Sequence, residues 1–152
     1  MHINEATILL NVEASSKEDV LDQMGKNLVE LGRVKESFIA AITAREDEYP
    51  TGLPTAGVAV AIPHTDVEHV REKTISIATL KKPVSFGVMG GDSSEQVAVK
   101  VVFMLAMEEA HSQLTLLQQL MQLFQDETKL MTLAQATDKT EVMQLVSNNL
   151  DL

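Results

Sequence analysis

The stretch that most constrains the fold of this chain runs from Gly57 to Asp66 and reads Gly-Val-Ala-Val-Ala-Ile-Pro-His-Thr-Asp. Its first six residues are all small or apolar, a pattern typical of a strand that is buried on both faces of a sheet. Pro63 cannot donate a ladder hydrogen bond, so the strand should end there. His64 and a polar tail then follow at the carboxyl end of the strand, where open α/β sheets place reacting groups.

Other apolar patterns predict the remaining strands of the sheet. They are 6–12, whose residues 6–10 would also suit the start of a helix; 74–80, half-buried by its alternation; 84–88, a short edge strand; and 97–107, the most hydrophobic run and a central strand. Lys81-Lys82-Pro83 predicts a turn between the second and third of these. The segments 49–54 and 90–94 are rich in proline or glycine and predict loops.

Helices are expected between and after these strands. Ser15 or Ser16 can cap the first helix, which runs to Leu31 and ends at Gly32. The others are 34–45, with Arg45 in its last turn; a helix after His111 with Leu114, Leu117, Leu120, Met121 and Phe124 on one face; one from about Asp126; and one capped near Asp138. This order predicts an α/β fold, and a length of 152 residues predicts a single domain over 1–152.

Composition excludes several classes of function. The formal net charge of −10 opposes binding to nucleic acid or to an anionic membrane, and favours an electropositive protein partner. Aromatic residues make up 3% of the chain, too few for a stacking platform, and the absence of cysteine rules out thiol nucleophiles and disulfides. The chain starts without a signal peptide pattern and its apolar runs are shorter than a membrane span, so we expect a cytoplasmic protein without direct membrane insertion.

His64 is the candidate for covalent chemistry as a phosphate carrier. A neutral imidazole is a competent nucleophile near pH 7, provided that an acceptor holds the proton on its other ring nitrogen. Asp66, Glu68 or a backbone carbonyl could be that acceptor. His111 follows another strand, so the two imidazoles would converge at one edge of the sheet if both strands run the same way.

Supporting roles are expected for residues near His64. Arg45 could add positive charge for the phosphoryl group, although a cation in the last turn of a helix is also explained by the helix dipole. Thr65, Asp66 and His69 are candidates for support around His64.

Other kinds of site compete with a phosphohistidine. His64, Asp66, Glu68 and His69 are all metal-ligand types and lie close together, which would suit a metal-dependent hydrolase. Their spacing differs from the helical His-Glu-x-x-His signature, and a strand-like tail would point alternate residues to opposite sides. A Ser-His-Asp site lacks the Gly-x-Ser-x-Gly elbow. A binding role, in which a phosphorylated histidine controls a protein partner, stays open.

The chain resembles the enzyme IIA components of the sugar phosphotransferase system (PTS), in the fructose-mannitol class. The resemblance rests on Ala44-Arg45-Glu46, on Ile62-Pro63-His64 after an apolar strand, on the long strand to Met107, and on Glu109-Ala110-His111 opening the Leu-rich helix. Ala44–Gly52 and a second histidine five positions after His64 look most like the galactitol-type branch. Mannitol-type and nitrogen-regulatory relatives commonly have glycine where this chain has Thr65.

The resemblance implies a fold, a reaction and partners. The fold would be a mixed β-sheet sandwiched by helices. His64 would accept a phosphoryl group from the carrier protein HPr and pass it to a cysteine of a IIB component, which serves a IIC permease in the uptake of a sugar or polyol. His111 would stabilise the phosphoryl group, Arg45 would supply charge, and neither a cofactor nor a metal would be needed.

Overall fold

A five-stranded mixed sheet organises the computed structural model, which describes residues 3–108 and 110–150 and leaves out the side chains of 110–113. The strands are β1 (Ile8–Val12), β2 (Gly52–Leu53), β3 (Ala59–Ala61), β4 (Thr74–Gly87) and β5 (Gln96–Ala106). Their order across the sheet is β1-β4-β5-β3-β2, with β1 parallel to β4, β4 antiparallel to β5, β5 parallel to β3 and β3 antiparallel to β2. The expectation of a mixed sheet with a central strand near 97–107 is therefore confirmed.

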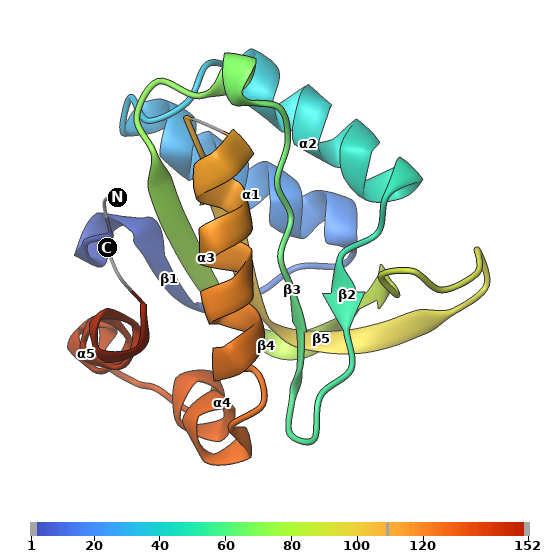
Figure 1. Cartoon of the computed structure of the whole chain (residues 1–152), viewed down its shortest axis with the longest axis vertical. Coiled ribbons are helices and arrows are strands. Elements are labelled where there is room, and N and C mark those ends of the chain that lie inside the picture. The colour runs from blue at the N-terminus through green and yellow to red at the C-terminus, as the bar shows by residue number, and fades with distance from the viewer. Residues whose placement is uncertain (1–2, 109, 151–152) are drawn as a thin grey trace.

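Helices cover both faces of this sheet (Figure 1). On one face lie α1 (Lys17–Glu30) and α2 (Ser37–Glu48), and on the other lie α3 (Ala110–Leu123), α4 (Glu127–Ala134) and α5 (Lys139–Asn149). Two short 3-10 helices, η1 (Glu5–Thr7) and η2 (Val67–His69), complete the described elements. In the part of the chain that the structure describes, no helix has the length and apolar character needed to cross a membrane.

Alternation along the strands divides the core into two layers. Val60, Ile62 and Phe103 point to the face that packs against the helices α3 to α5. Ala61 and Val102 point to the opposite face and pack against α1 and α2. Both faces of the central strands are thus dry, which is why their sequences are apolar without a polar side.

The segment from Thr74 to Gly87 is one continuous strand, so the predicted turn at Lys81-Lys82-Pro83 is wrong. The ladder to β5 changes register between Thr79 and Val84, and this irregularity accommodates a proline without a lost ladder bond. The ammonium of Lys100 donates to the carbonyls of Leu80 and Lys81 there. The part from Val84 to Gly87 is the end of β4 and not a separate short strand; it pairs with β5, whereas the pairing of β1 with β4 reaches only Leu80. The part 74–80 is fully buried instead of half-buried.

Three smaller expectations also need correction. The second helix is α2, which starts at Ser37 and not at Val34, because Val34 forms an isolated bridge with Val70. The loop at 49–54 contains the short strand β2. On α3, Leu114 is 57% exposed, whereas Leu116 and Leu123 belong to the buried face.

Candidate active site

The pairing between β3 and β5 fixes His64 at the edge of the sheet that is formed by the carboxyl ends of these two parallel strands. Strand β3 ends at Ala61, but the carbonyl of Pro63 still accepts a hydrogen bond from the Leu105 amide at 2.9 Å. His64 then forms a parallel bridge with Leu105, in the same register that pairs Ala61 with Val102. Because the register continues past the proline, alternation puts His64 on the same face as Ile62, the face covered by α3.

A backbone carbonyl fixes the tautomer of the His64 ring. The Nδ1 atom of His64 lies 2.8 Å from the carbonyl oxygen of Ile62. A carbonyl can only accept, so Nδ1 carries the proton and donates it. The neutral ring therefore has an unprotonated Nε2. Of the three acceptors considered from the sequence, Asp66, Glu68 and a backbone carbonyl, the structure selects the last.

The surroundings of His64 keep its ring neutral. Burial lowers the pKa of His64 below its ordinary value of 6.5, and the positive charge of Arg45 lowers it further. The hydrogen bond to the Ile62 carbonyl opposes this shift but does not reverse it. At pH 7 the half-buried imidazole is consequently uncharged and nucleophilic at Nε2.

Arg45 reaches the site from the last turn of α2. Its guanidinium carbon lies 5.2 Å from the centre of the Tyr49 ring, and its Nη1 lies 3.9 Å from a carboxylate oxygen of Asp66. The ring and the carboxylate orient the guanidinium, while its 38% exposure leaves donors available to an anion. The charge predicted near His64 is therefore present in space as well as in sequence.

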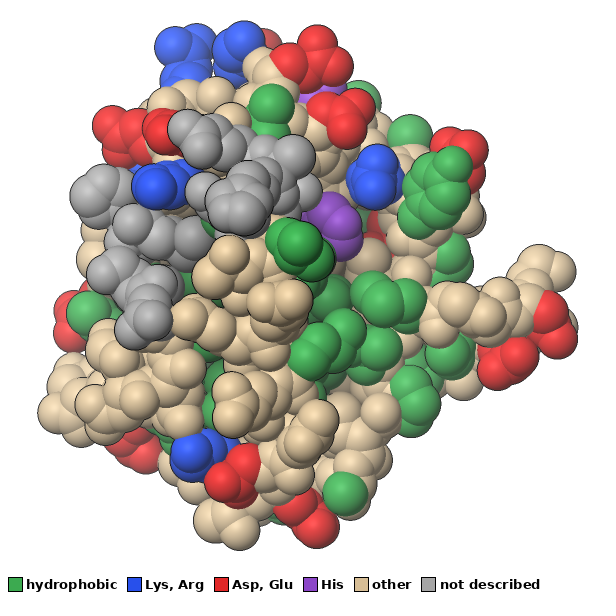
Figure 2. Space-filling model, viewed as in Figure 1, with side chains coloured by type: hydrophobic (Ala, Val, Ile, Leu, Met, Phe, Trp, Pro, Cys, Tyr) green, Lys and Arg blue, Asp and Glu red, His purple; other side chains and the backbone are tan. Residues whose placement is uncertain are grey.

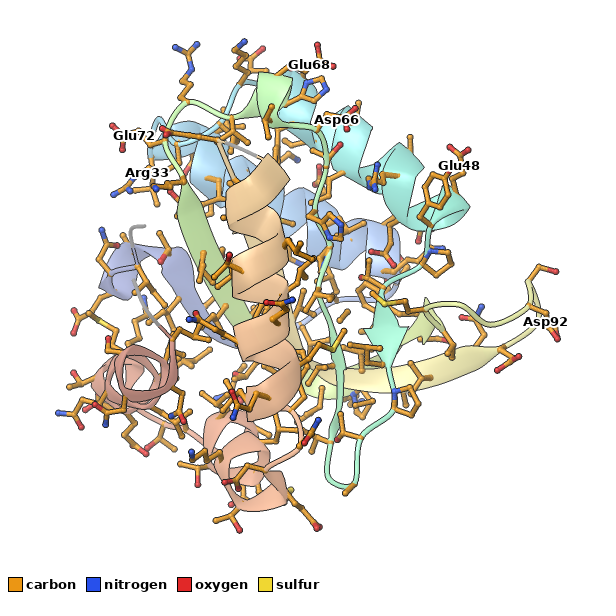
Figure 3. All side chains as sticks on the ribbon, in the orientation of Figure 1. Arg33, Glu48, Asp66, Glu68, Glu72 and Asp92 are labelled. Carbon is orange, nitrogen blue, oxygen red and sulfur yellow. The ribbon has the colours of Figure 1, made fainter. Side chains whose placement is uncertain are left out.

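The acidic tail after His64 lies at the same edge of the sheet (Figure 3). Asp66 is exposed and pairs with Arg45, and Glu68 lies 3.7 Å from Nε2 of His69. His69 bonds through Nδ1 to the Ser37 hydroxyl at 2.9 Å, and its carbonyl accepts from the Lys35 amide. These contacts fasten the segment that follows His64 to the start of α2. Thr65 is 5% exposed and lies between His64 and η2.

A buried carboxylate behind His64 was missed by sequence reasoning. Glu46 is 2% exposed and accepts two hydrogen bonds of 2.7 Å from Thr51, one from its amide and one from its hydroxyl. The Thr51 hydroxyl oxygen in turn accepts from the Ile62 amide at 3.2 Å. Burial raises the pKa of Glu46 to about 7, although the bonds from Thr51 oppose that rise.

A signal for this carboxylate exists in the sequence. Phe38 and Ile42 form the buried stripe of α2, and Glu46 is the next position on that stripe. A glutamate in line with buried apolar residues must find partners inside the protein, since an unpaired buried charge is costly.

His111 belongs to the first turn of α3, which begins at Ala110 shortly after β5 ends. Because β3 and β5 are parallel, their carboxyl ends share the edge where His64 lies. The side chain of His111 lies outside the described residues, so the convergence of the two imidazoles stays a prediction.

The surface around this edge is partly apolar (Figure 2). Hydrophobic side chains gather beside one histidine, and a basic side chain lies on its other side. The large hydrophobic residues that stay exposed include Tyr49 at the end of α2, Val67 in η2 and Leu114 on α3, at 57%, 37% and 57%. A half-buried nucleophile with an apolar and basic surround is suited to meeting another protein.

The residues after β3 that could bind a metal make other contacts. Nδ1 of His64 and Nδ1 of His69 are both engaged, with the Ile62 carbonyl and the Ser37 hydroxyl. Within residues 3–108 and 110–150, no group of three or more histidine, cysteine, aspartate or glutamate side chains is arranged to hold a metal ion, the side chains of 110–113 aside.

Comparison with known proteins gives consistent results at the level of the whole chain. The family described as "Phosphoenolpyruvate-dependent sugar phosphotransferase system, EIIA 2" matches residues 1–149. The galactitol-specific EIIA component of Escherichia coli strain K12 is 33% identical over 101 residues, which are 66% of this chain and 66% of that relative. The match thus falls just short of two thirds of the relative's own length.

Solved structures agree on the fold. The crystal structure of IIA mannitol from Escherichia coli is 25% identical, with a TM-score of 0.78, over 96% of this chain and 99% of that one. The complex of enzyme IIAMTL with phosphorylated enzyme IIBMTL from Escherichia coli contains a chain with a TM-score of 0.79 and 24% identity, over 97% of this chain and 98% of that one.

Proposed function

We propose that this chain, which belongs to the phosphoenolpyruvate-dependent sugar phosphotransferase system EIIA 2 family, carries a phosphoryl group on Nε2 of His64. The observation that carries the proposal is the hydrogen bond from Nδ1 of His64 to the Ile62 carbonyl, which leaves Nε2 as the free nucleophile. The lowered pKa of His64 keeps this nitrogen unprotonated at pH 7.

Phosphoryl uptake then needs no proton transfer at His64. The lone pair of Nε2 attacks phosphorus, the bond between phosphorus and the donor's histidine nitrogen breaks, and its electron pair stays on the donor ring. Nδ1 keeps its proton and its bond to Ile62 throughout. Catalysis is mostly positioning and charge stabilisation in such a transfer. Discharge reverses the roles: an acceptor thiolate attacks phosphorus, and the pair returns to Nε2.

The donor in this proposal is phospho-HPr and the acceptor is a cysteine of a cognate IIB component, which works with a IIC permease. The IIA mannitol relative whose complex is solved meets a phosphorylated IIB partner, which supports a IIB acceptor here. The relationship to a galactitol-specific EIIA component supports uptake of a sugar or polyol of the galactitol kind. The whole chain acts as one carrier domain in the cytoplasm.

Arg45 and His111 complete the proposed site. Arg45 supplies positive charge near His64, and its guanidinium is held by Asp66 and Tyr49. His111 donates to the phosphoryl oxygens from the first turn of α3, whose N-terminal dipole favours an anion in the same place. Alternation along β3 puts His64 on the α3 face, which supports this pairing.

The test is phosphorylation with phosphoenolpyruvate, enzyme I and HPr, followed by intact mass and 31P NMR at alkaline pH. The unchanged chain should gain one acid-labile phosphoryl group, and His64→Ala should gain none, because Nε2 is lost. His2→Ala is the matched control, which removes a different histidine and should be phosphorylated at the normal rate. Phosphorylation that persists in His64→Ala would refute the proposal.

A second step separates a transport component from a regulatory module. Phosphorylated protein is mixed with purified IIB components of the galactitol, mannitol and fructose classes, and loss of the phosphohistidine is followed by 31P NMR. Fast discharge onto a IIB cysteine supports the proposed role. Protein that is phosphorylated on His64 but discharges onto none of them would favour the regulatory alternative.

A further inference from the structure

We infer that Glu46 and Thr51 are positioning residues for His64, which together hold the backbone of Ile62 so that its carbonyl fixes the imidazole. The inference rests on the proposed function, since it assigns roles within the same site. Neither residue lies among the groups that would meet the phosphoryl group: both are buried, at 2% and 4% exposure, on the inner side of His64.

The path from the carboxylate to the ring consists of three consecutive contacts. The Thr51 hydroxyl donates to Glu46 at 2.7 Å, its oxygen accepts from the Ile62 amide at 3.2 Å, and the Ile62 carbonyl accepts from the ring at 2.8 Å. Because the Thr51 hydroxyl donates its hydrogen bond to the carboxylate, its oxygen can only accept from the Ile62 amide. The Thr51 amide, bonded to the second carboxylate oxygen at 2.7 Å, keeps the threonine in place.

The location of Ile62 explains why its backbone needs this support. Strand β3 has three residues and ends just before Ile62, and the next residue is Pro63, which has no amide proton. The Thr51 hydroxyl accepts the Ile62 amide on one side, and the Leu105 amide holds the Pro63 carbonyl on the other. A nucleophile misplaced by about 1 Å can react about a hundredfold more slowly, so the two hydrogen bonds that hold Ile62 and Pro63 matter for phosphoryl transfer.

The contacts join Glu46 to His64 through the backbone of Ile62. Burial and the positive charge of Arg45 lower the pKa of His64, and burial raises the pKa of Glu46. A proton relay along this path is ruled out, because the amide and the carbonyl of Ile62 belong to different peptide groups. Positioning through the backbone of Ile62 is what the contacts allow.

The experiment compares isosteric changes in this path at about pH 8, where the Glu46 carboxyl, with its pKa of about 7, is ionised. Thr51→Val removes the hydroxyl and keeps the shape, Thr51→Ser keeps the hydroxyl, and Glu46→Gln replaces one carboxylate oxygen by a donor. Thr43→Val and Glu48→Gln are matched controls on α2: the Thr43 hydroxyl bonds to Ile39 and Glu48 is exposed.

Two readouts are measured on each folded variant. Long-range 1H–15N NMR reports which nitrogen of His64 carries the proton, together with the Ile62 amide shift. Single-turnover uptake from purified phospho-HPr reports the rate. We expect Thr51→Val and Glu46→Gln to populate the Nε2–H tautomer and to slow phosphoryl uptake about tenfold, the change in rate that corresponds to the loss of one good hydrogen bond. Thr51→Ser and both controls should match the unchanged protein.

The outcomes distinguish this inference from the proposed function. If His64 keeps its tautomer and its rate in Thr51→Val, or if Thr51→Ser loses as much as Thr51→Val, the hydroxyl does not position the ring and the inference is wrong. If the unchanged protein takes no phosphoryl group, the proposed function fails, while the tautomer measurement still decides the role of Thr51. If Glu46→Gln does not fold, the two Thr51 variants carry the test.

Discussion

His64 holds its proton on Nδ1 because a backbone carbonyl 2.8 Å away can only accept. A side-chain carboxylate in that place would have stabilised the imidazolium and raised the pKa of the ring. Burial and the charge of Arg45 lower the pKa of His64 below 6.5, because the hydrogen bond to the neutral carbonyl raises it by less than they lower it. The choice of a backbone acceptor thus keeps a histidine nucleophilic without a separate base.

The same balance predicts the effect of removing the nearby cation. Arg45→Gln should raise the pKa of His64, because the positive charge that disfavours the imidazolium is gone. A group with a lowered pKa loses its neutral form as pH falls through that pKa, so the acid limb of phosphoryl uptake should move to higher pH in the variant. NMR titration of the His64 ring and the pH profile of uptake measure the two effects.

Lys82→Gln provides a charge-matched control for this variant. Lys82 is exposed on β4, well along the strand from the end that lies beside Leu105, and its loss should leave both measurements unchanged. A His64 pKa that stays the same or falls in Arg45→Gln would show that the guanidinium does not act on the ring.

Among the elements, helix α1 depends on a cap that the sequence left undecided between two serines. The Ser16 hydroxyl accepts from the Asp19 amide at 3.1 Å, whereas Ser15 uses its own backbone amide as a donor to the Asp19 carboxylate. The helix then buries Val20, Met24 and Leu28 against the sheet. The cap therefore stabilises an element that closes one face of the core and lies away from Nε2 of His64.

Ser16→Ala should lower the free energy of unfolding by about 1 kcal/mol, because the Asp19 amide loses its acceptor. Chemical denaturation measures this change. Ser15→Ala is the control and should cost less than about 0.5 kcal/mol, since its backbone donor remains. Phosphoryl uptake should be unaffected in both variants at a temperature where both are folded. Equal losses in the two variants would assign the cap wrongly.

At the scale of the whole molecule, net charge and surface pattern act together on partner binding. The chain carries 22 acidic against 12 basic residues, for a net charge of −10. Near His64, Arg45 nevertheless lies against the exposed ring of Tyr49, and Val67, three residues after His64, is exposed as well. The long-range field would attract an electropositive donor, and the apolar contacts would hold the docked complex.

Raising the ionic strength from about 0.05 M to about 0.5 M should therefore slow uptake from phospho-HPr by several-fold, because screening shortens the reach of the field to a few ångströms. Stopped-flow single-turnover kinetics below saturation measure the second-order rate. Discharge from a preformed complex is the control and should vary little with salt. A second-order rate that is constant or rises with salt would contradict electrostatic attraction.

Local patterns in the sequence predict much of the fold. The apolar runs located β1, β3 and β5. The pair Ser15-Ser16, Asp126 and Asp138 marked helix starts, because strand burial and helix caps are properties of neighbouring residues. Patterns failed where partners decide the outcome: Lys81-Lys82-Pro83 has the composition of a turn, but Lys100 and the register shift keep it in the strand.

The candidate site divides in the same way. His64, His111 and Arg45 are predicted from their residue types, from their places after strands or in a helix, and from the family resemblance of the motifs around them, and their roles stay predictions. The tertiary structure decided that Ile62 and not Asp66 or Glu68 holds the ring, and that Glu46 lies buried behind Thr51. The stripe of α2 signals that Glu46 is buried, but its link to His64 depends on β2 pairing with β3, which brings Thr51 to the amide of Ile62. Which strands pair is decided by the packing of the whole sheet, and this choice leaves no local pattern in a single sequence.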